Sequence, residues 1–256
     1  MPARPDLSGL RAAMAACREA GCLPALWLRD DDAVAPTPAL DRLLRFSQTT
    51  GLATHLAVIP ADATEALGAY VSSNSEFIPV IHGLAHQNHA PVGEKKAEFG
   101  PHRSLQERLA DAQTGLDKLR RLFGNRLCPA FVPPWNRMAD DMAEGLATAG
   151  FTMISTYGPR SVTLPAGGMV QINTHIDPID WRGTRGLADP DLILARLSAT
   201  LIARAQGETD GTEPLGLLTH HLVQDAAIWD FCEWLVGTLL DGGATPWRAD
   251  RKDEPE

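Results

Sequence analysis

Residues 24–32 read PALWLRDDD, a short apolar run that ends in three adjacent aspartates. A run of this length, bounded by a proline and by charged residues, is typical of a buried strand. The next segment, residues 38–50, has apolar side chains at helical spacing and ends before Gly51, which favours helix termination. A second apolar run follows at residues 53–59. Strand, helix and strand in succession predict parallel strands covered by a helix.

The same alternation continues to residue 240. Apolar runs predict seven strands, at residues 24–29, 53–59, 77–81, 128–132, 151–155, 169–174 and 215–219. Helical spacing predicts helices at residues 38–50, 62–72, 104–123, 139–149, 190–205 and 225–240. Asp62 is the expected cap of the second helix, and Ser104 with Glu107 forms a capping box at the third. The pattern therefore predicts an α/β protein with a parallel sheet.

The composition excludes several classes of protein. Of the 256 residues 44 % are hydrophobic, so the chain is able to fold around a core. The net charge of −9 argues against nucleic-acid binding and against binding an anionic membrane surface. No apolar run approaches the roughly 18 residues that span a bilayer. The four cysteines form no C-x-x-C pair and the first residues lack a signal-peptide core, so we expect a cytoplasmic protein without membrane insertion.

Polar residues collect where the predicted strands end. Residues 30–32 are aspartates after the first strand, and three histidines within eight residues follow the third strand. Further polar clusters follow the fourth, sixth and seventh strands, at residues 133–137, 175–181 and 220–221. The carboxyl ends of parallel strands lie at one edge of a sheet or barrel, so we expect these residues to meet at one mouth.

The three histidines suggest a metal site. His82, His86 and His89 are separated by four and three residues, spacings that bring imidazoles to one face of a helical turn. Neutral imidazole suits zinc and similar divalent ions, and an aspartate from residues 30–32 adds an oxygen ligand. The two clusters together favour a metal site over a solvated acidic turn and a polar loop. A His₂Asp set also leaves coordination positions for water and substrate, as catalysis requires.

The order of these motifs resembles the NodB-type polysaccharide deacetylases, carbohydrate esterase family 4, from Trp27 to His221. The resemblance implies a single distorted (β/α)7 barrel over residues 1–240, with a flexible tail over residues 241–256. The chain departs from the family in its three consecutive aspartates and in lacking the arginine of the third motif.

In the first two motifs, the resemblance implies Asp31 as the catalytic base and Asp32 as a metal ligand, with Asp30 in the place of an aromatic residue. The register with Asp30 as base and Asp31 as ligand stays open. His82 and His86 match the H-x-x-x-H motif and are the other expected ligands. The expected ion is Zn²⁺, with Co²⁺, Ni²⁺, Mn²⁺ and Fe²⁺ as alternatives.

The third motif keeps a proline and Trp135, and the resemblance implies that the backbone N–H of Trp135 holds the oxyanion. Asn136 and Arg137 are expected to contact substrate. His89, near the second motif, is expected either to line the pocket or to support a metal ligand. Either Arg137 or Arg29 is expected to replace the missing arginine, which orients the base in the family.

The fourth motif, D-x-x-D-W, starts at Asp177 and ends in Asp180 and Trp181. By resemblance, Asp180 and Trp181 face the pocket, and Trp181 forms a wall around the acyl group. The fifth motif is a strand ending in His220, the expected acid that protonates the leaving amine. His221 stands where the family often has aspartate and is the alternative acid.

The resemblance implies a metal-dependent hydrolase that removes an N-acetyl or other N-acyl group from an amino sugar by cleaving a linear C–N amide bond. A cytoplasmic location favours a small or carrier-linked N-acylated amino sugar. Two alternatives stay open: hydrolysis of a non-sugar amide such as a ureide or cyclic amide, and a non-catalytic barrel that binds a glycan or a partner. Residues 93–103, with Lys95, Lys96, His102 and Arg103, either contact an anionic substrate group or form a solvated loop.

Overall fold

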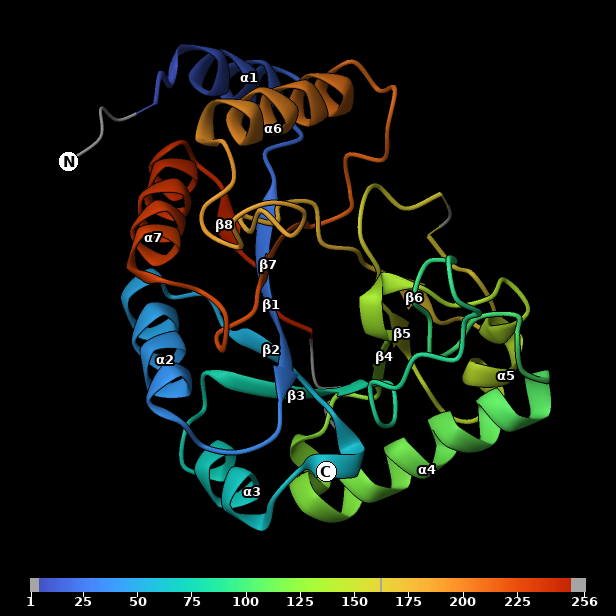
Figure 1. Ribbon diagram of the computed structural model, residues 1–256. Helices are drawn as coiled ribbons and strands as arrows, with labels where there is room; N and C mark the ends of the chain where they lie inside the picture. Colours follow the sequence, from blue (N-terminus) through green and yellow to red (C-terminus); the bar gives the residue numbers. More distant parts are fainter. Residues whose placement is uncertain (1–4, 162, 250–256) are drawn as a thin grey trace, which may run out of the picture.

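Parallel strands curl into a distorted barrel in the computed structural model, which describes residues 5–161 and 163–249 (Figure 1). The strand order is β6-β5-β4-β3-β2-β1-β7, and every neighbouring pair is parallel. The predicted α/β distorted barrel is confirmed, and its sheet has the form of a half-barrel. The strands are β1 Ala25–Ala33, β2 Thr54–Val58, β3 Phe77–His82, β4 Ala130–Val132, β5 Met153–Ile154, β6 Val170–Gln171 and β7 Leu215–Thr219.

Helices cover the outer face of this sheet (Figure 1). Helix α1 packs against α6, α2 against α7, and α4 against both α3 and α5. No described helix is long and apolar enough to span a bilayer. The helices are α1 Ser8–Glu19, α2 Pro38–Thr50, α3 Glu65–Ser72, α4 Leu105–Phe123, α5 Met142–Thr148, α6 Pro190–Ala205 and α7 Ala226–Asp241, with the short 3-10 turns η1 Pro60–Asp62, η2 Gly124–Arg126 and η3 Pro134–Asn136.

The sequence prediction omits helix α1, although the helix carries an amphipathic signal. Its buried residues have the spacing i, i+3, i+4 and i+7, and they are Leu10, Ala13, Met14 and Cys17. This stripe packs against α6 and belongs to the main hydrophobic core between the helices and the sheet. Helix α1 therefore forms part of the layer that covers the barrel.

Local capping sets the start of two helices, one of them as predicted. The Ser104 hydroxyl accepts from the Glu107 N–H, and the Glu107 carboxylate accepts from the Ser104 N–H, so the capping box of α4 is confirmed. The cap of α3 is Thr64, which accepts from the Leu67 N–H, and not Asp62. Asp62 ends the 3-10 turn η1 instead, and α3 begins after that turn.

Alternation along β1 aims its polar residues into the barrel. Leu26 and Leu28 pack outward against the helices, whereas Trp27 points inward. The period of two in a strand puts Arg29 and Asp31 on the same inward face as Trp27. The interior cluster around Trp27 is apolar and consists of Ala57, Val80, Ala130, Val132, Met153 and Ile172. Arg29 and Asp31 therefore lie between this apolar layer and the carboxyl ends of the strands.

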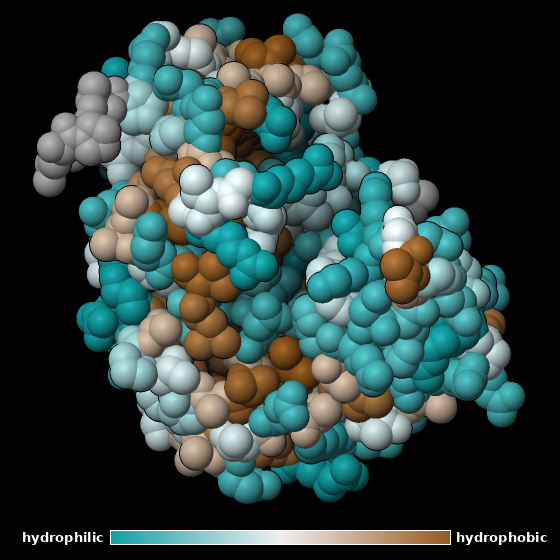
Figure 2. Space-filling model, viewed as in Figure 1, coloured by the Kyte–Doolittle hydropathy of each residue, from teal (hydrophilic) through white to brown (hydrophobic). Residues whose placement is uncertain are grey.

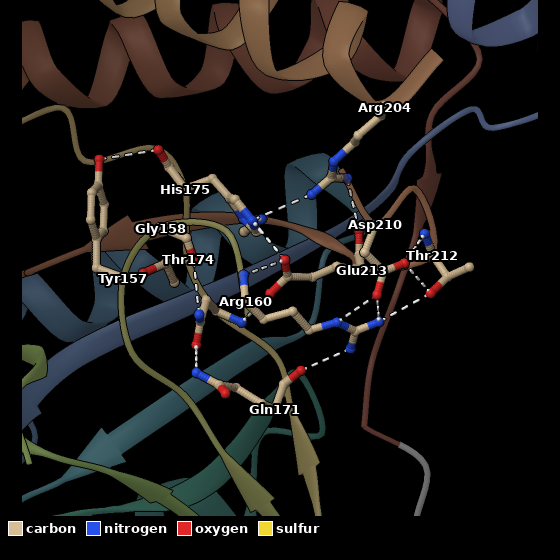
Figure 3. A network of polar contacts seen from close by, with 12 residues as sticks. Tyr157, Gly158, Arg160, Gln171, Thr174, His175, Arg204, Asp210, Thr212 and Glu213 are labelled. Carbon is tan, nitrogen blue, oxygen red and sulfur yellow. Dashed lines mark hydrogen bonds and ion pairs between the residues drawn. The ribbon is translucent and has the colours of Figure 1, made fainter. Parts of the chain in front are cut away.

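Strand β6 has only two residues and forms no ladder of hydrogen bonds with β7. Polar side chains close this side of the barrel instead. An isolated parallel bridge between Ile176 and Leu217 joins the two edges. Figure 3 shows a group of side chains beside this junction, drawn from loops and from α6, that we call the polar seam: Arg160, His175, Arg204, Asp210 and Glu213.

Each charged group of the polar seam is matched by a partner. The Glu213 carboxylate is 2 % exposed and accepts from two backbone N–H groups and from His175 Nε2, at 3.2 Å. Arg160 pairs with Asp210 at 2.6 Å, and Arg204 donates to the Glu213 carbonyl oxygen at 2.7 Å. These contacts hold the segment that follows β6 against β7.

The C-terminal segment is fastened to the barrel as far as Ala249. Strand β8, Thr245–Pro246, pairs in parallel with the start of β1. The ring centroid of Trp247 lies 5.9 Å from that of Trp27 and 5.5 Å from that of His55, and the Ala249 N–H donates to His55 Nε2. These contacts fasten residues 245–249, which lie within the segment 241–256 predicted to be a flexible tail. Residues 250–256 of that prediction lie outside the described residues.

Candidate metal centre

Asp32, His82 and His86 form a cluster that fits a divalent cation. Asp32 Oδ1 lies 3.2 Å from His82 Nε2 and 3.4 Å from His86 Nε2. All three candidate ligand atoms lie within 4.8 Å of one another. Asp32 Oδ1 is buried without a hydrogen-bond partner among the described residues, which is costly unless a ligand supplies one. One carboxylate and two imidazoles form a ligand set typical of catalytic zinc, so the residues fit the expected ion.

The strand ends place these ligands as the sequence predicts. His82 is the last residue of β3, and its Nδ1–H donates to the Val132 carbonyl oxygen of the neighbouring strand at 3.0 Å. That contact fixes the tautomer and leaves Nε2 for the ion. Asp32 and His86 have φ of 76° and 54°, in the left-handed region that non-glycine residues seldom adopt and in which Asp and His are enriched. Asp32 reaches it within the register shift of β1 between Asp30 and Ala33.

Glu98 holds the loop between the two histidine ligands, a role that the sequence analysis misses. Its carboxylate is 2 % exposed and accepts from the backbone N–H groups of Leu84, Ala85 and Gln87, at 3.2, 2.8 and 3.4 Å. A Cβ at Gly83 would lie 2.3 Å from Glu98 Oε2, so only glycine fits the approach. The signal in the sequence is a lone glutamate in the apolar stretch AEFG, which does not reveal its partners.

The expected base, Asp31, is held by Arg29. The Arg29 Nε and Nη2 atoms donate to the two carboxylate oxygens of Asp31 at 2.9 and 3.0 Å, and both residues are buried. The rest of the guanidinium donates to Ser155 Oγ at 2.7 Å and to Asn136 Oδ1 at 2.6 Å. Arg137 is exposed and donates to a carbonyl oxygen at Lys96. Of the two arginines expected to replace the family's arginine, Arg29 is therefore the one that contacts Asp31.

Asp30 faces away from the triad and contacts the last residues of β7 and the turn beyond. Its Oδ2 accepts from Thr219 Oγ1 at 2.7 Å and from the His221 N–H at 2.9 Å. Its Oδ1 lies 2.5 Å from His221 Nδ1. Burial by itself would lower the pKa of His221, but the Asp30 carboxylate outweighs burial and raises it. The geometry thus groups Asp32 with the histidines and gives Asp30 a partner of its own.

His220 and Trp181 lie on the other side of the mouth. Their rings are in edge contact, with 4.7 Å between centroids, and Trp181 Nε1 donates to Asp177 Oδ2 at 2.7 Å. His220 Nδ1 is buried and has no hydrogen-bond partner among the described residues. An imidazole with a buried, uncommitted nitrogen is suited to moving a proton to or from a ligand.

Comparison with known proteins identifies the fold. No protein-family model and no curated protein matches the chain in sequence. A family 4 carbohydrate esterase from Streptomyces lividans in complex with acetate is 14 % identical, with 91 % of this chain and 96 % of that chain covered and a TM-score of 0.53. A peptidoglycan deacetylase from Bacillus subtilis is 15 % identical, with 88 % and 87 % covered and a TM-score of 0.50. The chain has the fold of the family 4 carbohydrate esterases.

This fold also occurs in a protein described as a pseudoenzyme. A family 4 pseudoenzyme from Bacillus anthracis is 14 % identical, with 87 % of this chain covered and a TM-score of 0.53. The chain spans 63 % of the length of that protein. A mutant of that pseudoenzyme is described as having restored enzymatic activity. A family 4 fold therefore does not by itself establish activity, which has to be inferred from the side chains of the site.

Two further residues expected to contact substrate in this esterase fold have other contacts. The Asp180 carboxylate accepts from the Gly183 and Thr184 N–H groups, both at 3.0 Å, within its own turn. His89 lies half-buried and donates its backbone N–H to the Ala97 carbonyl oxygen. Trp135, by contrast, lies at the site, with its ring centroid 4.3 Å from that of His86.

The ionisation of two triad residues, Asp32 and His86, suits a cation, whereas the neighbouring Asp31 and Asp32 raise the pKa of His82. Burial alone would raise the pKa of Asp32, but the neighbouring imidazoles of His82, His220 and His86 outweigh it and lower the pKa. Burial and the neighbouring His82 lower the pKa of His86. Near pH 7 Asp32 is therefore a carboxylate and His86 a neutral imidazole, the forms in which both residues bind metal.

Proposed function

We propose that the chain is a divergent family 4 carbohydrate esterase that removes an N-acetyl or other N-acyl group from an amino sugar. The observation that carries the proposal is Asp32 Oδ1, which is buried without a hydrogen-bond partner beside the Nε2 atoms of His82 and His86. A divalent ion supplies the partner that this oxygen lacks. The proposed ion is Zn²⁺, with Co²⁺, Ni²⁺, Mn²⁺ and Fe²⁺ as alternatives.

The side chains around the triad have the roles that amide hydrolysis requires. The ion, when bound, supplies Lewis-acid activation of the amide carbonyl and of water. Asp31 accepts the proton of the attacking water, and Arg29 holds its carboxylate in place. The Trp135 N–H donates to the developing oxyanion. His220 protonates the departing amine, and Trp181, whose ring contacts His220, forms one wall of the acyl pocket.

The proposed substrate is a small or carrier-linked N-acylated amino sugar in the cytoplasm. All four cysteines, Cys17, Cys22, Cys128 and Cys232, are free thiols, which supports a reducing compartment. The similar structures include an esterase in complex with acetate, the acyl product expected for this class of reaction.

Metal removal and a ligand variant test the proposal together. Exhaustive chelation is expected to abolish release of acetate from N-acetylglucosamine oligomers and monomers, and addition of Zn²⁺ is expected to restore it. The variant His82→Ala is expected to lose both the ion, measured by elemental analysis, and the activity. His102→Ala is the matched control, because His102 contacts Glu94 and not the triad. Full activity in protein shown to be metal-free would overturn the proposal.

The base variant separates an enzyme from a non-catalytic barrel. Asp31→Asn is expected to keep the ion and to lose activity, because Asp31 takes part in proton transfer and not in coordination. A protein that binds the ion but hydrolyses no N-acetyl sugar would instead be a glycan- or partner-binding barrel. Ureides and cyclic amides in the same panel of substrates distinguish a sugar amidohydrolase from an enzyme for other amides.

A further inference from the structure

The cations of residues 93–103 separate into paired and unpaired groups. His102 lies 3.5 Å from Glu94, and Arg103 pairs with Asp111 at 2.6 Å. Lys95 and Lys96 are exposed and, among the described residues, have no carboxylate within ion-pair distance. Of the two interpretations of this segment, a solvated loop and an anion contact, the second therefore concerns the two lysines and not His102 or Arg103.

Lys96 lies beside the metal centre. Its Nζ lies 5.9 Å from the ring centroid of Trp135, over the ring, and the same ring is 4.3 Å from His86. A single indole thus separates the ammonium group from a metal ligand. The cation–π contact orients the ammonium group over the indole.

Arg137 adds a second unpaired cation next to Lys96. Its Nη1 donates to the Lys96 carbonyl oxygen at 2.9 Å, and no carboxylate of the described residues pairs with it. The two segments are fixed to one another by a parallel bridge between Phe99 and Met138, and Glu98 is buried under the histidine loop. The backbone segments that carry Lys96 and Arg137 are therefore fixed relative to one another.

Lys96 and Arg137 form a local positive charge on a chain whose net charge is −9. A positive pair at the rim of a site attracts anionic ligands and repels cationic ones. Two unit positive charges match the charge of a phosphate monoester near pH 7, and Arg and Lys are the usual phosphate-binding side chains.

We propose that Lys96 and Arg137 bind a phosphoryl group carried by the amino-sugar substrate. The inference rests on the proposed function, since it places the phosphoryl group next to the acyl group that is hydrolysed. In this proposal, Lys96 is the residue that discriminates between phosphorylated and neutral amino sugars. The phosphoryl group belongs either to a sugar phosphate or to a nucleotide diphosphate sugar, and the substrates below distinguish the two.

The test compares neutral and phosphorylated substrates with the metal-loaded full chain. The wild-type protein is expected to hydrolyse N-acetylglucosamine 6-phosphate, N-acetylglucosamine 1-phosphate or uridine diphosphate N-acetylglucosamine with a kcat/KM at least about tenfold above that for N-acetylglucosamine. Lys96→Met is expected to remove this preference through KM for the phosphorylated sugars. Lys96→Arg is expected to restore most of the preference.

A neighbouring lysine provides the control. Lys95→Met removes the same charge one residue away, so an equal effect of both variants would mean a diffuse field and overturn the assignment to Lys96. Equal kcat/KM for neutral and phosphorylated sugars in the wild-type protein would also overturn it, while leaving the proposed deacetylation intact.

A binding measurement distinguishes failure of the proposed anion site from failure of the proposed deacetylase activity. Calorimetric titration with glucosamine 6-phosphate and with glucosamine needs no catalysis. Tighter binding of the phosphate, lost in Lys96→Met, would support the anion site even if no acetylated sugar were hydrolysed. Hydrolysis of neutral sugars with no difference in binding between the two ligands would retain the enzyme and reject the anion site.

Discussion

Titratable side chains are buried both in the polar seam and at the mouth of the barrel. In the polar seam their polar atoms have hydrogen-bond partners, whereas at the mouth several of these atoms have none among the described residues. In the polar seam, Glu213 accepts from two backbone N–H groups and from His175, and Arg160 is paired with Asp210. At the mouth, three buried side-chain atoms have no hydrogen-bond partner among the described residues, and they are Asp32 Oδ1, His220 Nδ1 and His221 Nε2.

This difference separates a structural cluster from a functional one. An unpartnered buried polar atom costs about 1–3 kcal/mol, so a fold retains it where a ligand supplies the missing contact. The polar seam replaces strand pairing between β6 and β7, and its charged groups have their hydrogen-bond partners without a ligand. Burial of charge alone would not have told the two apart.

The largest effect is expected at the mouth, from Asp32→Asn. Loss of the anionic ligand is expected to reduce kcat/KM by about a thousandfold or more, because the ion contributes several kcal/mol to the transition state. The melting temperature of the metal-free protein is expected to change little, because the Asp32 side chain is 31 % exposed and solvent screens its charge. Steady-state kinetics and thermal unfolding measure both effects.

Asp62→Asn serves as the control for that variant, because Asp62 is exposed at the end of η1. A metal-free Asp32→Asn protein that melts well below the wild type would show that Asp32 is a structural residue like those of the polar seam.

The next largest effect is expected in the polar seam, from Glu213→Ala. Removing one partner of a buried charged network is expected to lower the free energy of unfolding by about 3–5 kcal/mol, because two N–H groups and the imidazole of His175 lose their acceptor. Urea unfolding measures the change. Glu208→Ala, at an exposed position in the preceding turn, is expected to change it by less than about 0.5 kcal/mol. A similar small change for Glu213→Ala would contradict the structural role of the polar seam.

A third prediction concerns His55, at the amino ends of the strands. Burial lowers the pKa of His55 from 6.5 to about 4, and both ring nitrogens are used, Nδ1 donating to Leu28 and Nε2 accepting from Ala249. Because the folded protein holds His55 neutral, its contribution is fully present above pH 6.5 and is lost as the pH falls toward 4. The shift corresponds to about 3 kcal/mol of stability.

Unfolding free energies measured between pH 7 and pH 4 test this dependence. His55→Gln is expected to flatten the curve in that range, whereas His102→Gln, beside the exposed Glu94, is expected to leave it nearly unchanged. An unaltered slope in His55→Gln would assign the acid sensitivity to other groups.

The smallest effect is expected from Glu98→Gln. Glu98 is a carboxylate near the mouth that already has hydrogen-bond partners. One carboxylate oxygen becomes an amide that no longer accepts, so the loop holding His86 loosens while the fold stays intact. Affinity for Zn²⁺, measured by competition with a chelator, is expected to fall about 10- to 100-fold. Glu94→Gln, on an exposed carboxylate of the same segment, is the matched control. Equal affinities in the two variants would mean that Glu98 does not position the ligand.

The sequence predicted the parts of the molecule that depend on local pattern. The apolar runs and caps predicted α2, α6 and β7 with their observed bounds. The H-x-x-x-H spacing and the aspartate run predicted a metal site, and the resemblance to the esterases implied Asp32, His82 and His86 as its ligands while a second aspartate register stayed open. The prediction was weaker where strands are short, since β5 and β6 have two residues each against five and six expected. There the seam side chains replace ladder hydrogen bonds, and no local pattern encodes that.

By itself, the sequence determined which residues stand at strand ends, because period-two and helical spacing are properties of neighbouring residues. Only the tertiary structure decided which of them act together. It paired Asp31 with Arg29 rather than Arg137, gave Asp30 to His221, and set Glu98 under the histidine loop. These contacts join residues that are distant in sequence or that alternate between the two faces of one strand. Their geometry follows from how the strands curl and where the chain shifts register, which residue spacing alone does not fix.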